Sequence, residues 1–241
     1  MLDERLRRLQ WKEPPPGAML YDASAFATDD CAQPISSRLL TPDGFARAER
    51  VGVGGRQAAW FVSDRFGDGV LRHYRRGGLV ARISDARYVW TGEDRSRSFA
   101  EYRLLAQMVD RGLPVPQPLA AGYWRHGLTY SAALLTRRIP GARALAECLA
   151  SAPLQDVAAA IVAMHRAGVW HADLNVFNIM VDQQGKVWLI DFDRSRAGGV
   201  SDSARDANLQ RLARSLRKVA GENGARIATL VLQHYHDRWQ G

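Results

Sequence analysis

HADLNVFN, residues 171–178, is the stretch that decides how this sequence folds, together with DFD at residues 191–193, which ends an apolar run. The Asp173 carboxylate can orient a substrate hydroxyl. The amide oxygen of Asn178 and the carboxylate of Asp191 are hard oxygen ligands of the kind that Mg²⁺ takes. An Asp, an Asn and a second Asp at this spacing are typical of phosphoryl transfer. The sequence therefore predicts Asp173 as the catalytic carboxylate, and Asn178 and Asp191 as metal ligands.

The residues on both sides of these motifs predict a helical lobe over residues 137–241. A helix is expected between Pro153 and Gly168, since apolar residues recur there at helical spacing. A hairpin is expected over residues 179–190, turned at Gln183-Gln184-Gly185, and two helices follow it to the C-terminus. His165 and His171 are interpreted as packing residues, because no carboxylate is spaced to activate them.

Upstream, residues 45–136 predict a second lobe built on an antiparallel sheet. Short apolar runs alternate with glycines from residue 51 to residue 83, and another strand pair is expected within residues 119–136. Between them a helix begins near Ser96 or Ser98 and carries a lone acidic residue, Glu101. The change of character after residue 136 is the predicted boundary between the lobes.

Residues 1–44 are predicted to form an N-terminal arm and the start of the sheet lobe. Leu2, Leu6 and Leu9 fall on one helical face among arginines, and Pro14-Pro15-Pro16-Gly17 would end such a helix. Two interpretations stay open for this segment: a foot on an anionic bilayer, or a solvated arm that packs one edge against the body of the protein.

Composition narrows the class of protein. The 241 residues are 46% hydrophobic, enough for a sizeable core. We find no apolar run of the roughly 18–20 residues that a membrane-spanning helix needs and no signal peptide at the N-terminus, so a cytoplasmic location is expected. Cys31 and Cys148 lie far apart, without metal-ligand spacing. A net charge of +8 indicates an anionic partner: nucleic acid, a phosphorylated substrate or an acidic membrane surface.

The order of these features resembles the protein-kinase-like fold, which implies an α+β bilobal architecture with one helix in the sheet lobe and a reduced helical lobe. In that fold a glycine-rich turn covers the nucleotide phosphates, a role that Gly52, Gly54 and Gly55 would take. Only three of the 33 basic residues are lysines (Lys12, Lys186 and Lys218). The resemblance implies that Arg72, paired with Glu101, takes the place of the usual phosphate-binding lysine, with Arg82 as the competing candidate.

Longer segments carry a closer resemblance. They are LRHYRRGGL at residues 71–79, RSFAE at 97–101 with GLPVP at 112–116, LTRRIPG at 135–141 and NLQRL at 208–212. They resemble the lipopolysaccharide kinase family, and within it the kinases of 3-deoxy-D-manno-octulosonic acid (Kdo).

That resemblance implies an ATP- and Mg²⁺-dependent phosphorylation of the 4-hydroxyl of Kdo on a lipid A precursor. It also implies a peripheral location on the anionic cytoplasmic face of the inner membrane. Four arginines could then meet the acidic sugar and the lipid A phosphates, or could be solvated charges; they are Arg75, Arg76, Arg137 and Arg138.

Two alternatives remain. One is another small-molecule or protein kinase of the same fold, such as one similar to the aminoglycoside phosphotransferases. A second is an inactive kinase-like binding module, for which the missing lysine is the best argument. A nucleic-acid partner is not expected, since the aromatic residues fall mostly at core-like positions rather than along a basic stripe. Oligomeric state is not indicated by the sequence.

Overall fold

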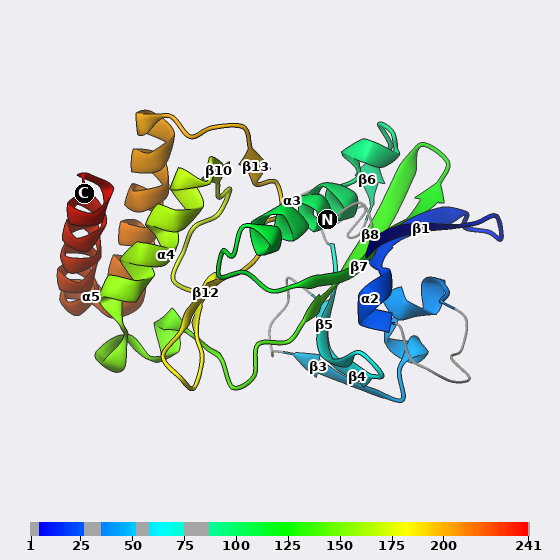
Figure 1. Cartoon of the computed structure of the whole chain (residues 1–241), viewed down its shortest axis with the longest axis horizontal. Coiled ribbons are helices and arrows are strands. Elements are labelled where there is room, and N and C mark those ends of the chain that lie inside the picture. Colours follow the sequence, from blue (N-terminus) through cyan, green and yellow to red (C-terminus); the bar gives the residue numbers. More distant parts are fainter. Residues whose placement is uncertain (1–4, 27–34, 52–57, 75–86, 241) are drawn as a thin grey trace. The chain divides into compact units, whose positions relative to one another are not determined.

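A computed structural model describes residues 5–26, 35–51, 58–74 and 87–240 of the chain (Figure 1). It divides into two compact units. Unit 1 contains Met1–Ala106 and Gln117–Arg138, and unit 2 contains Gln107–Pro116 and Ile139–Gly241. Unit 1 is built on an antiparallel sheet and unit 2 is mainly helical. The predicted α+β class is confirmed.

The sheet of unit 1 follows the spatial order β1-β2-β7-β8-β5-β4-β3, with β6 paired to β8 (Figure 1). Its strands are β1 (Leu6–Trp11), β2 (Gly17–Asp22), β3 (Arg47–Val51), β4 (Ala58–Asp64), β5 (Gly67–His73), β6 (Tyr88–Val89), β7 (Pro118–His126) and β8 (Thr129–Arg137). Neighbouring strands are antiparallel throughout. This confirms the strands predicted near residues 58–62, 69–74, 119–123 and 128–136; the runs predicted as strands at residues 52–56 and 79–83 lie outside the described residues.

The N-terminal helix predicted from the leucine spacing is wrong for the described residues. Strand β1 instead pairs with β2, and β2 pairs with β7 inside the sheet. Arg8 donates two hydrogen bonds to the Glu93 carboxylate, at 2.7 and 2.8 Å, and the Tyr123 hydroxyl donates a third at 2.7 Å. The bond from Arg8 is the main reason that the Glu93 pKa lies below its ordinary value. Contacts with residues far along the chain therefore override the local helical pattern.

Gly17 explains why the hairpin can close where it does. A side chain at this position would overlap the Tyr123 carbonyl oxygen and the ring of Trp11. Glycine lets the start of β2 approach both groups.

Helix α3 (Arg97–Asp110) is the long helix that begins in unit 1, and the short α2 (Ala23–Phe26) precedes it in the chain. The Ser98 hydroxyl donates to the Gly122 carbonyl at 2.9 Å and so joins α3 to β7. Three 3₁₀ turns complete the described part of unit 1: η1 (Ser37–Leu40), η2 (Pro42–Gly44) and η4 (Glu93–Arg95). Buried side chains on one side of the sheet form its core, among them Met19, Leu40, Leu71, Leu119 and Leu135.

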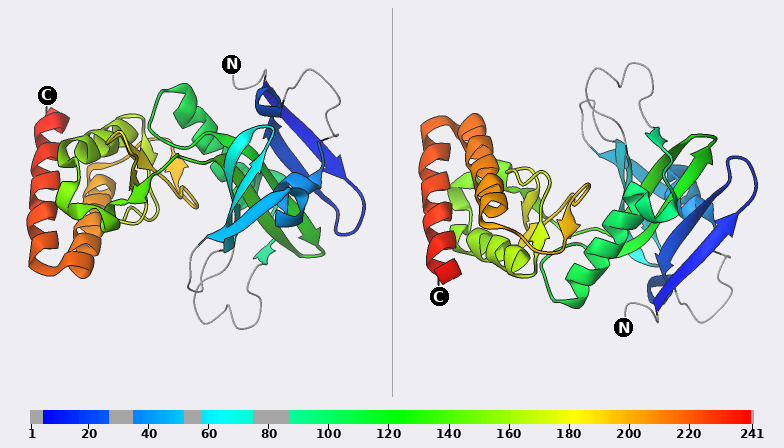
Figure 2. Two further views of the ribbon diagram at one scale, coloured as in Figure 1. Left: turned by 90° about the horizontal axis from the view of Figure 1, so that it is seen from below. Right: turned by 90° about the horizontal axis from the view of Figure 1, so that it is seen from above.

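Unit 2 is organised around α4 (Leu154–Arg166) and the long C-terminal segment α5 (Asp202–Gln240). Non-helical dihedral angles at Ala220 and Gly221 divide α5 into two arms, so two C-terminal helices are present, as predicted. Helix α4 lies beside these arms in both views of Figure 2. Within the described ranges, no helix combines the length and apolarity that crossing a bilayer requires.

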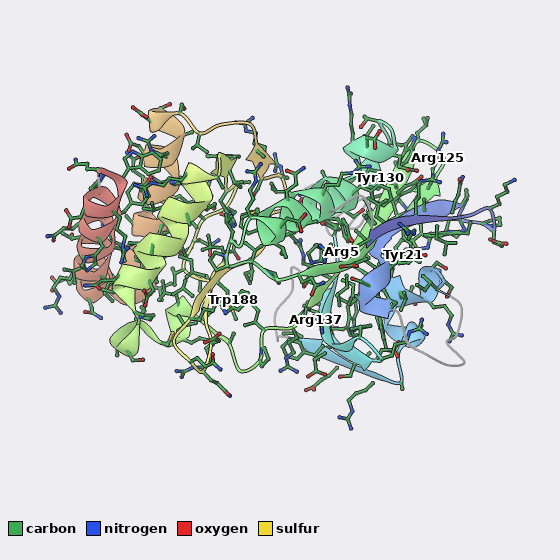
Figure 3. All side chains as sticks on the ribbon, viewed as in Figure 1. Arg5, Tyr21, Arg125, Tyr130, Arg137 and Trp188 are labelled. Carbon is green, nitrogen blue, oxygen red and sulfur yellow. The ribbon has the colours of Figure 1, made fainter. Side chains whose placement is uncertain are left out.

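Short strands precede α4 or connect it to α5. They are β9 (Arg143–Ala144), β10 (Val169–Trp170), β11 (Ile179–Val181), β12 (Val187–Leu189) and β13 (Arg196–Ala197), accompanied by η5 (Leu145–Glu147) and η6 (Leu149–Ser151). Strands β11 and β12 form the predicted hairpin. Asp182 closes its turn by accepting hydrogen bonds from the Gln184 and Lys186 amides and from the indole of Trp188, the residue labelled in Figure 3.

Candidate catalytic site

The loop of residues 171–178 alternates buried anchors with outward side chains. His171, Leu174 and Val176 are fully buried, whereas 54% of the Asp173 side chain is exposed. Buried apolar side chains fix the loop against the body of unit 2. The Asp173 carboxylate is therefore held on rigid backbone while it remains accessible to another molecule.

The His171 ring links this loop to the segment that carries Asp191. Its Nε2 lies 3.0 Å from the Ile190 carbonyl oxygen, which can only accept a hydrogen bond. Its Nδ1 accepts the Asp173 backbone N–H at 3.0 Å. Together these contacts require the neutral Nε2–H tautomer. Burial lowers the His171 pKa, which favours that neutral form. The predicted packing role of His171 is confirmed.

Asn178 is tied to both parts of the site. Its side-chain nitrogen donates a hydrogen bond to the Asp173 backbone carbonyl at 2.8 Å. The backbone carbonyl of Asn178 accepts a hydrogen bond from the Ile190 N–H at 3.0 Å. The amide nitrogen is thus occupied, and within the described residues no hydrogen bond is recorded to Oδ1. Asp191 follows Ile190 directly, so unit 2 brings the three predicted residues Asp173, Asn178 and Asp191 into one neighbourhood.

Asp191 has an unusual backbone conformation for a residue with a side chain. Its φ is +62°, in the left-handed region that mainly glycine adopts. Such conformations cost on the order of 1–3 kcal/mol and are concentrated at functional sites. The strain at Asp191 is consistent with a carboxylate whose direction matters.

The oxygen donors in this neighbourhood suit a magnesium ion. Among the described residues, no group of three or more His, Cys, Asp or Glu side chains forms a metal cluster. Mg²⁺ does not need such a cluster, because it is usually held by one or two protein ligands together with water and substrate phosphates. Asn178 Oδ1 and the Asp191 carboxylate match that requirement in kind.

Sequence reasoning missed three polar residues on one face of α5 that contact the loop. Asn208 donates to the His171 carbonyl at 2.7 Å and accepts the His171 N–H at 3.2 Å. Ser215 accepts the Val176 N–H at 3.2 Å. Arg211, between them, donates to Asp173 Oδ1 at 2.9 Å. Their spacing of three and four residues places them on one face of a helix, but the sequence does not show that this face meets the loop.

Asn208 is held in turn by a buried chain of hydrogen bonds. His165 Nε2 lies 3.1 Å from Asn208 Oδ1, and His165 Nδ1 lies 2.9 Å from the Tyr235 hydroxyl in the second arm of α5. Burial lowers the His165 pKa to about 4, against a smaller opposing effect of the bond to Asn208. The packing role predicted for His165 is confirmed, and it extends to positioning the loop.

In unit 1, the ion pair predicted between Arg72 and Glu101 is present. Arg72 Nη2 lies 2.6 Å from both Glu101 carboxylate oxygens, joining β5 to α3. The Tyr74 hydroxyl donates to the same carboxylate at 2.5 Å. The side chains of Arg72 and Glu101 are only 13% and 2% exposed. A buried arrangement of this kind holds the guanidinium in a defined place.

The other candidates from the sequence divide into two groups. Arg137, labelled in Figure 3, donates to the Phe66 carbonyl at 2.7 Å, and the Arg138 guanidinium lies 3.6 Å from the centre of the Phe61 ring. Both arginines are thus engaged within unit 1. The remaining candidates lie outside the described residues: Gly52, Gly54, Gly55, Arg75, Arg76 and Arg82.

Comparison with known proteins shows which family the chain matches. Residues 46–230 match the model of the lipopolysaccharide kinase (Kdo/WaaP) family. The 3-deoxy-D-manno-octulosonic acid kinase of Stenotrophomonas maltophilia (strain R551-3) is 46% identical over 211 residues, which are 86% of this chain and 82% of that protein. The protein of the same name from Xylella fastidiosa (strain M23) is 43% identical over 211 residues, with the same coverage. This chain belongs to the lipopolysaccharide kinase (Kdo/WaaP) family.

Proposed function

We propose that this protein transfers the γ-phosphoryl group of ATP to the 4-hydroxyl of Kdo carried on a lipid A precursor. The observation that carries the proposal is the loop of residues 171–178: it presents an exposed Asp173 beside an Asn178 amide whose nitrogen is already bonded. The family and the names of its relatives support the kinase activity and the sugar acceptor.

The chemistry assigned to Asp173 is that of a general base. Its carboxylate accepts the proton of the acceptor hydroxyl as the hydroxyl oxygen forms a bond to the γ-phosphorus. The bond between that phosphorus and the bridging oxygen breaks, and ADP leaves with the bonding electrons. A base positioned in this way contributes roughly 10²- to 10⁴-fold in rate. His171 contributes by holding the Asp173 backbone N–H in place.

Two further sets of residues are proposed to bind the metal and the nucleotide. Asn178 and Asp191 would hold Mg²⁺, which neutralises charge on the transferring phosphates when it is bound. Arg72, fixed by Glu101, would contact the nucleotide phosphates in the role that protein kinases give to lysine. A guanidinium can hold phosphate through two parallel hydrogen bonds. The glycine-rich turn at Gly52, Gly54 and Gly55 is proposed to cover those phosphates.

The location proposed for the protein is the cytoplasmic face of the inner membrane, bound peripherally. A net charge of +8 favours association with an anionic lipid surface, where the lipid-linked acceptor resides.

The direct test is an assay of the purified chain with ATP, Mg²⁺ and a Kdo-lipid A precursor. The expected product is a lipid that gains one phosphate, located on the Kdo 4-hydroxyl by nuclear magnetic resonance. ATP turnover without a phosphorylated lipid would remove the acceptor from the proposal and leave the kinase activity. In that case, a panel of soluble acceptors that includes aminoglycosides would show whether the protein is a small-molecule kinase of the same fold.

Asp173→Asn tests the assigned base. This substitution keeps the size of the side chain and removes its ability to take a proton, so kcat should fall by about 10²- to 10⁴-fold. Asp237→Asn is the matched control, because Asp237 is exposed near the end of α5. If Asp173→Asn left lipid phosphorylation unchanged, Asp173 would not be the base. If the unaltered chain turned over no ATP, an inactive binding module would be the better description.

A further inference from the structure

The pair between Arg211 and Asp173 has no evident role in stability. Arg211 Nη1 lies 2.9 Å from Asp173 Oδ1, and the two side chains are 47% and 54% exposed. Exposed ion pairs contribute little to folding, because water screens them and because two long side chains must be ordered. A pair with one member assigned as the catalytic base calls for an explanation in terms of the reaction.

Arg211 retains the capacity to bind a second anion. The guanidinium carries five N–H donors in a planar fork. In the part of the chain that the structure describes, its hydrogen bond to Asp173 is the one recorded for this group. Nearly half of the side chain is open to solvent. An incoming carboxylate could therefore reach the guanidinium without displacing any other protein group.

The proposed acceptor supplies such a carboxylate. Kdo is an acid that carries its carboxylate on C2, two ring carbons from the 4-hydroxyl. When the 4-hydroxyl is presented to Asp173, the carboxylate lies on the same sugar ring, close to whatever flanks Asp173. Arg211 is the cation recorded there among the described residues. Arginine suits this task because its fork matches the two oxygens of a carboxylate.

Two of the arginines first considered for this task, Arg137 and Arg138, are less suited to it; the other two, Arg75 and Arg76, lie outside the described residues. Arg137 and Arg138 are engaged with Phe66 and Phe61 within unit 1. Arg211 stands out because it belongs to the same unit as Asp173 and touches it directly.

We infer that Arg211 determines acceptor specificity by binding the carboxylate of the acid sugar while Asp173 receives the 4-hydroxyl. This inference rests on the proposed function. In the absence of acceptor, the hydrogen bond to Asp173 holds the guanidinium ready beside the base. An acceptor without a negative charge on C2 would leave Arg211 without its ligand and would bind weakly.

The test compares two acceptors that differ only in the carboxyl group attached to C2: the natural carboxylate and its uncharged methyl ester, both in detergent micelles. A charge-assisted contact of this kind corresponds to about a 10- to 100-fold effect on binding. The unaltered protein should therefore prefer the acid by about that factor in kcat/KM. Arg211→Gln should raise KM for the acid by a similar factor and bring the acid-to-ester ratio close to one, while KM for ATP stays constant. Arg211→Lys should recover part of the preference.

Arg217→Gln is the matched control, since Arg217 is an exposed arginine on the same arm of α5. It should keep the full preference for the acid. If Arg211→Gln lowered kcat and left the acid-to-ester ratio unchanged, Arg211 would only position Asp173 and the inference would fail. If the unaltered protein phosphorylated neither compound, the proposed function itself would fail. These two results are therefore distinguishable.

Discussion

His171 shows how a side chain that takes no part in the chemistry can define a site. One ring nitrogen holds the Asp173 backbone and the other holds Ile190, immediately before Asp191. Protonation would give Nδ1 a hydrogen that points at the Asp173 N–H, so only the neutral ring fits. The buried imidazole thus links the backbone of Asp173, the proposed catalytic carboxylate, to the residue before Asp191, a proposed metal ligand.

His165 provides a pH-dependent prediction. Its pKa is about 4 in the folded protein because of burial, against an ordinary value of 6.5. Between these values the unfolded chain binds more protons than the folded one, so stability decreases as the pH falls from above 6.5 toward 4. From pH 7 to pH 5 this group should account for a loss of about 2 kcal/mol in the free energy of unfolding.

Urea unfolding of the unaltered chain and of His165→Gln at both pH values measures this effect. Burial also lowers the pKa of His171. The informative quantity is therefore the difference between the two proteins in how their free energy of unfolding depends on pH. Gln cannot take up a proton, so its variant should lose less stability on acidification. Parallel losses in the two proteins would show that His165 is not the group responsible.

Side chains of helix α5 anchor the backbone of the loop of residues 171–178 through hydrogen bonds. The Asn208 side chain forms hydrogen bonds with both the carbonyl and the N–H of His171, and the Ser215 hydroxyl accepts a hydrogen bond from the Val176 N–H. Asn208 is buried, whereas Ser215 is only partly buried. Removing a buried partner leaves backbone groups unsatisfied, which costs about 1–3 kcal/mol.

Asn208→Leu should therefore destabilise the protein by about 1–3 kcal/mol and also lower kcat, because the backbone of His171 loses its anchor. Ser215→Ala should have a smaller effect on both quantities. Thermal unfolding and steady-state kinetics measure them on the same samples. Unchanged kcat in a folded Asn208→Leu protein would mean that the loop keeps its conformation without the hydrogen bonds from Asn208.

The junction of β5 with α3 gives a prediction about a buried charge pair. Arg72→Met leaves the buried Glu101 carboxylate without its arginine, and the expected loss is about 3–5 kcal/mol. Replacing both residues, as Arg72→Met with Glu101→Leu, removes the two charges together and should recover most of that stability. Neither protein should bind ATP normally, because the proposed phosphate contact is lost. Chemical denaturation and nucleotide titration separate the two effects; equal stability of the single and double variants would contradict this account.

Local patterns predicted the elements whose structure is locally determined. The spacing of apolar residues between Pro153 and Gly168 predicted α4, and the glycine turn at residues 183–185 predicted the β11–β12 hairpin; both are present in the structure. The N-terminal strands could not be predicted in this way, because β1 is selected by pairing with β2 and by the contact of Arg8 with Glu93, 85 positions away. Leucines at helical spacing carried no information about either partner.

The candidate site shows the same division. The spacing of Asp173, Asn178 and Asp191 was enough to predict that they belong together, since two of them flank one short hairpin. Arg211 could not be assigned to them, because its position depends on how α5 packs against the loop of residues 171–178. A polar residue on a helix is usually solvated, and only the fold distinguishes the exception.

The chain taken together combines a family assignment with a strong positive charge. The match over residues 46–230 includes β5, α3, the loop of residues 171–178 and the first arm of α5. The charge of +8 adds a general attraction to anionic surfaces without selecting an acceptor. Selection of the acceptor must therefore come from particular side chains, of which Arg211 is the one proposed here.

We propose that Asp173, Asn178 and Asp191 form one magnesium-dependent catalytic site. A crystal structure of the protein with Mg²⁺ and a non-hydrolysable ATP analogue tests it most directly. We expect a metal ion about 2.1 Å from Asn178 Oδ1 and from an Asp191 carboxylate oxygen, with the Asp173 carboxylate facing the γ-phosphate. A metal ion bound to other residues, or an Asp173 side chain directed away from the phosphates, would contradict it.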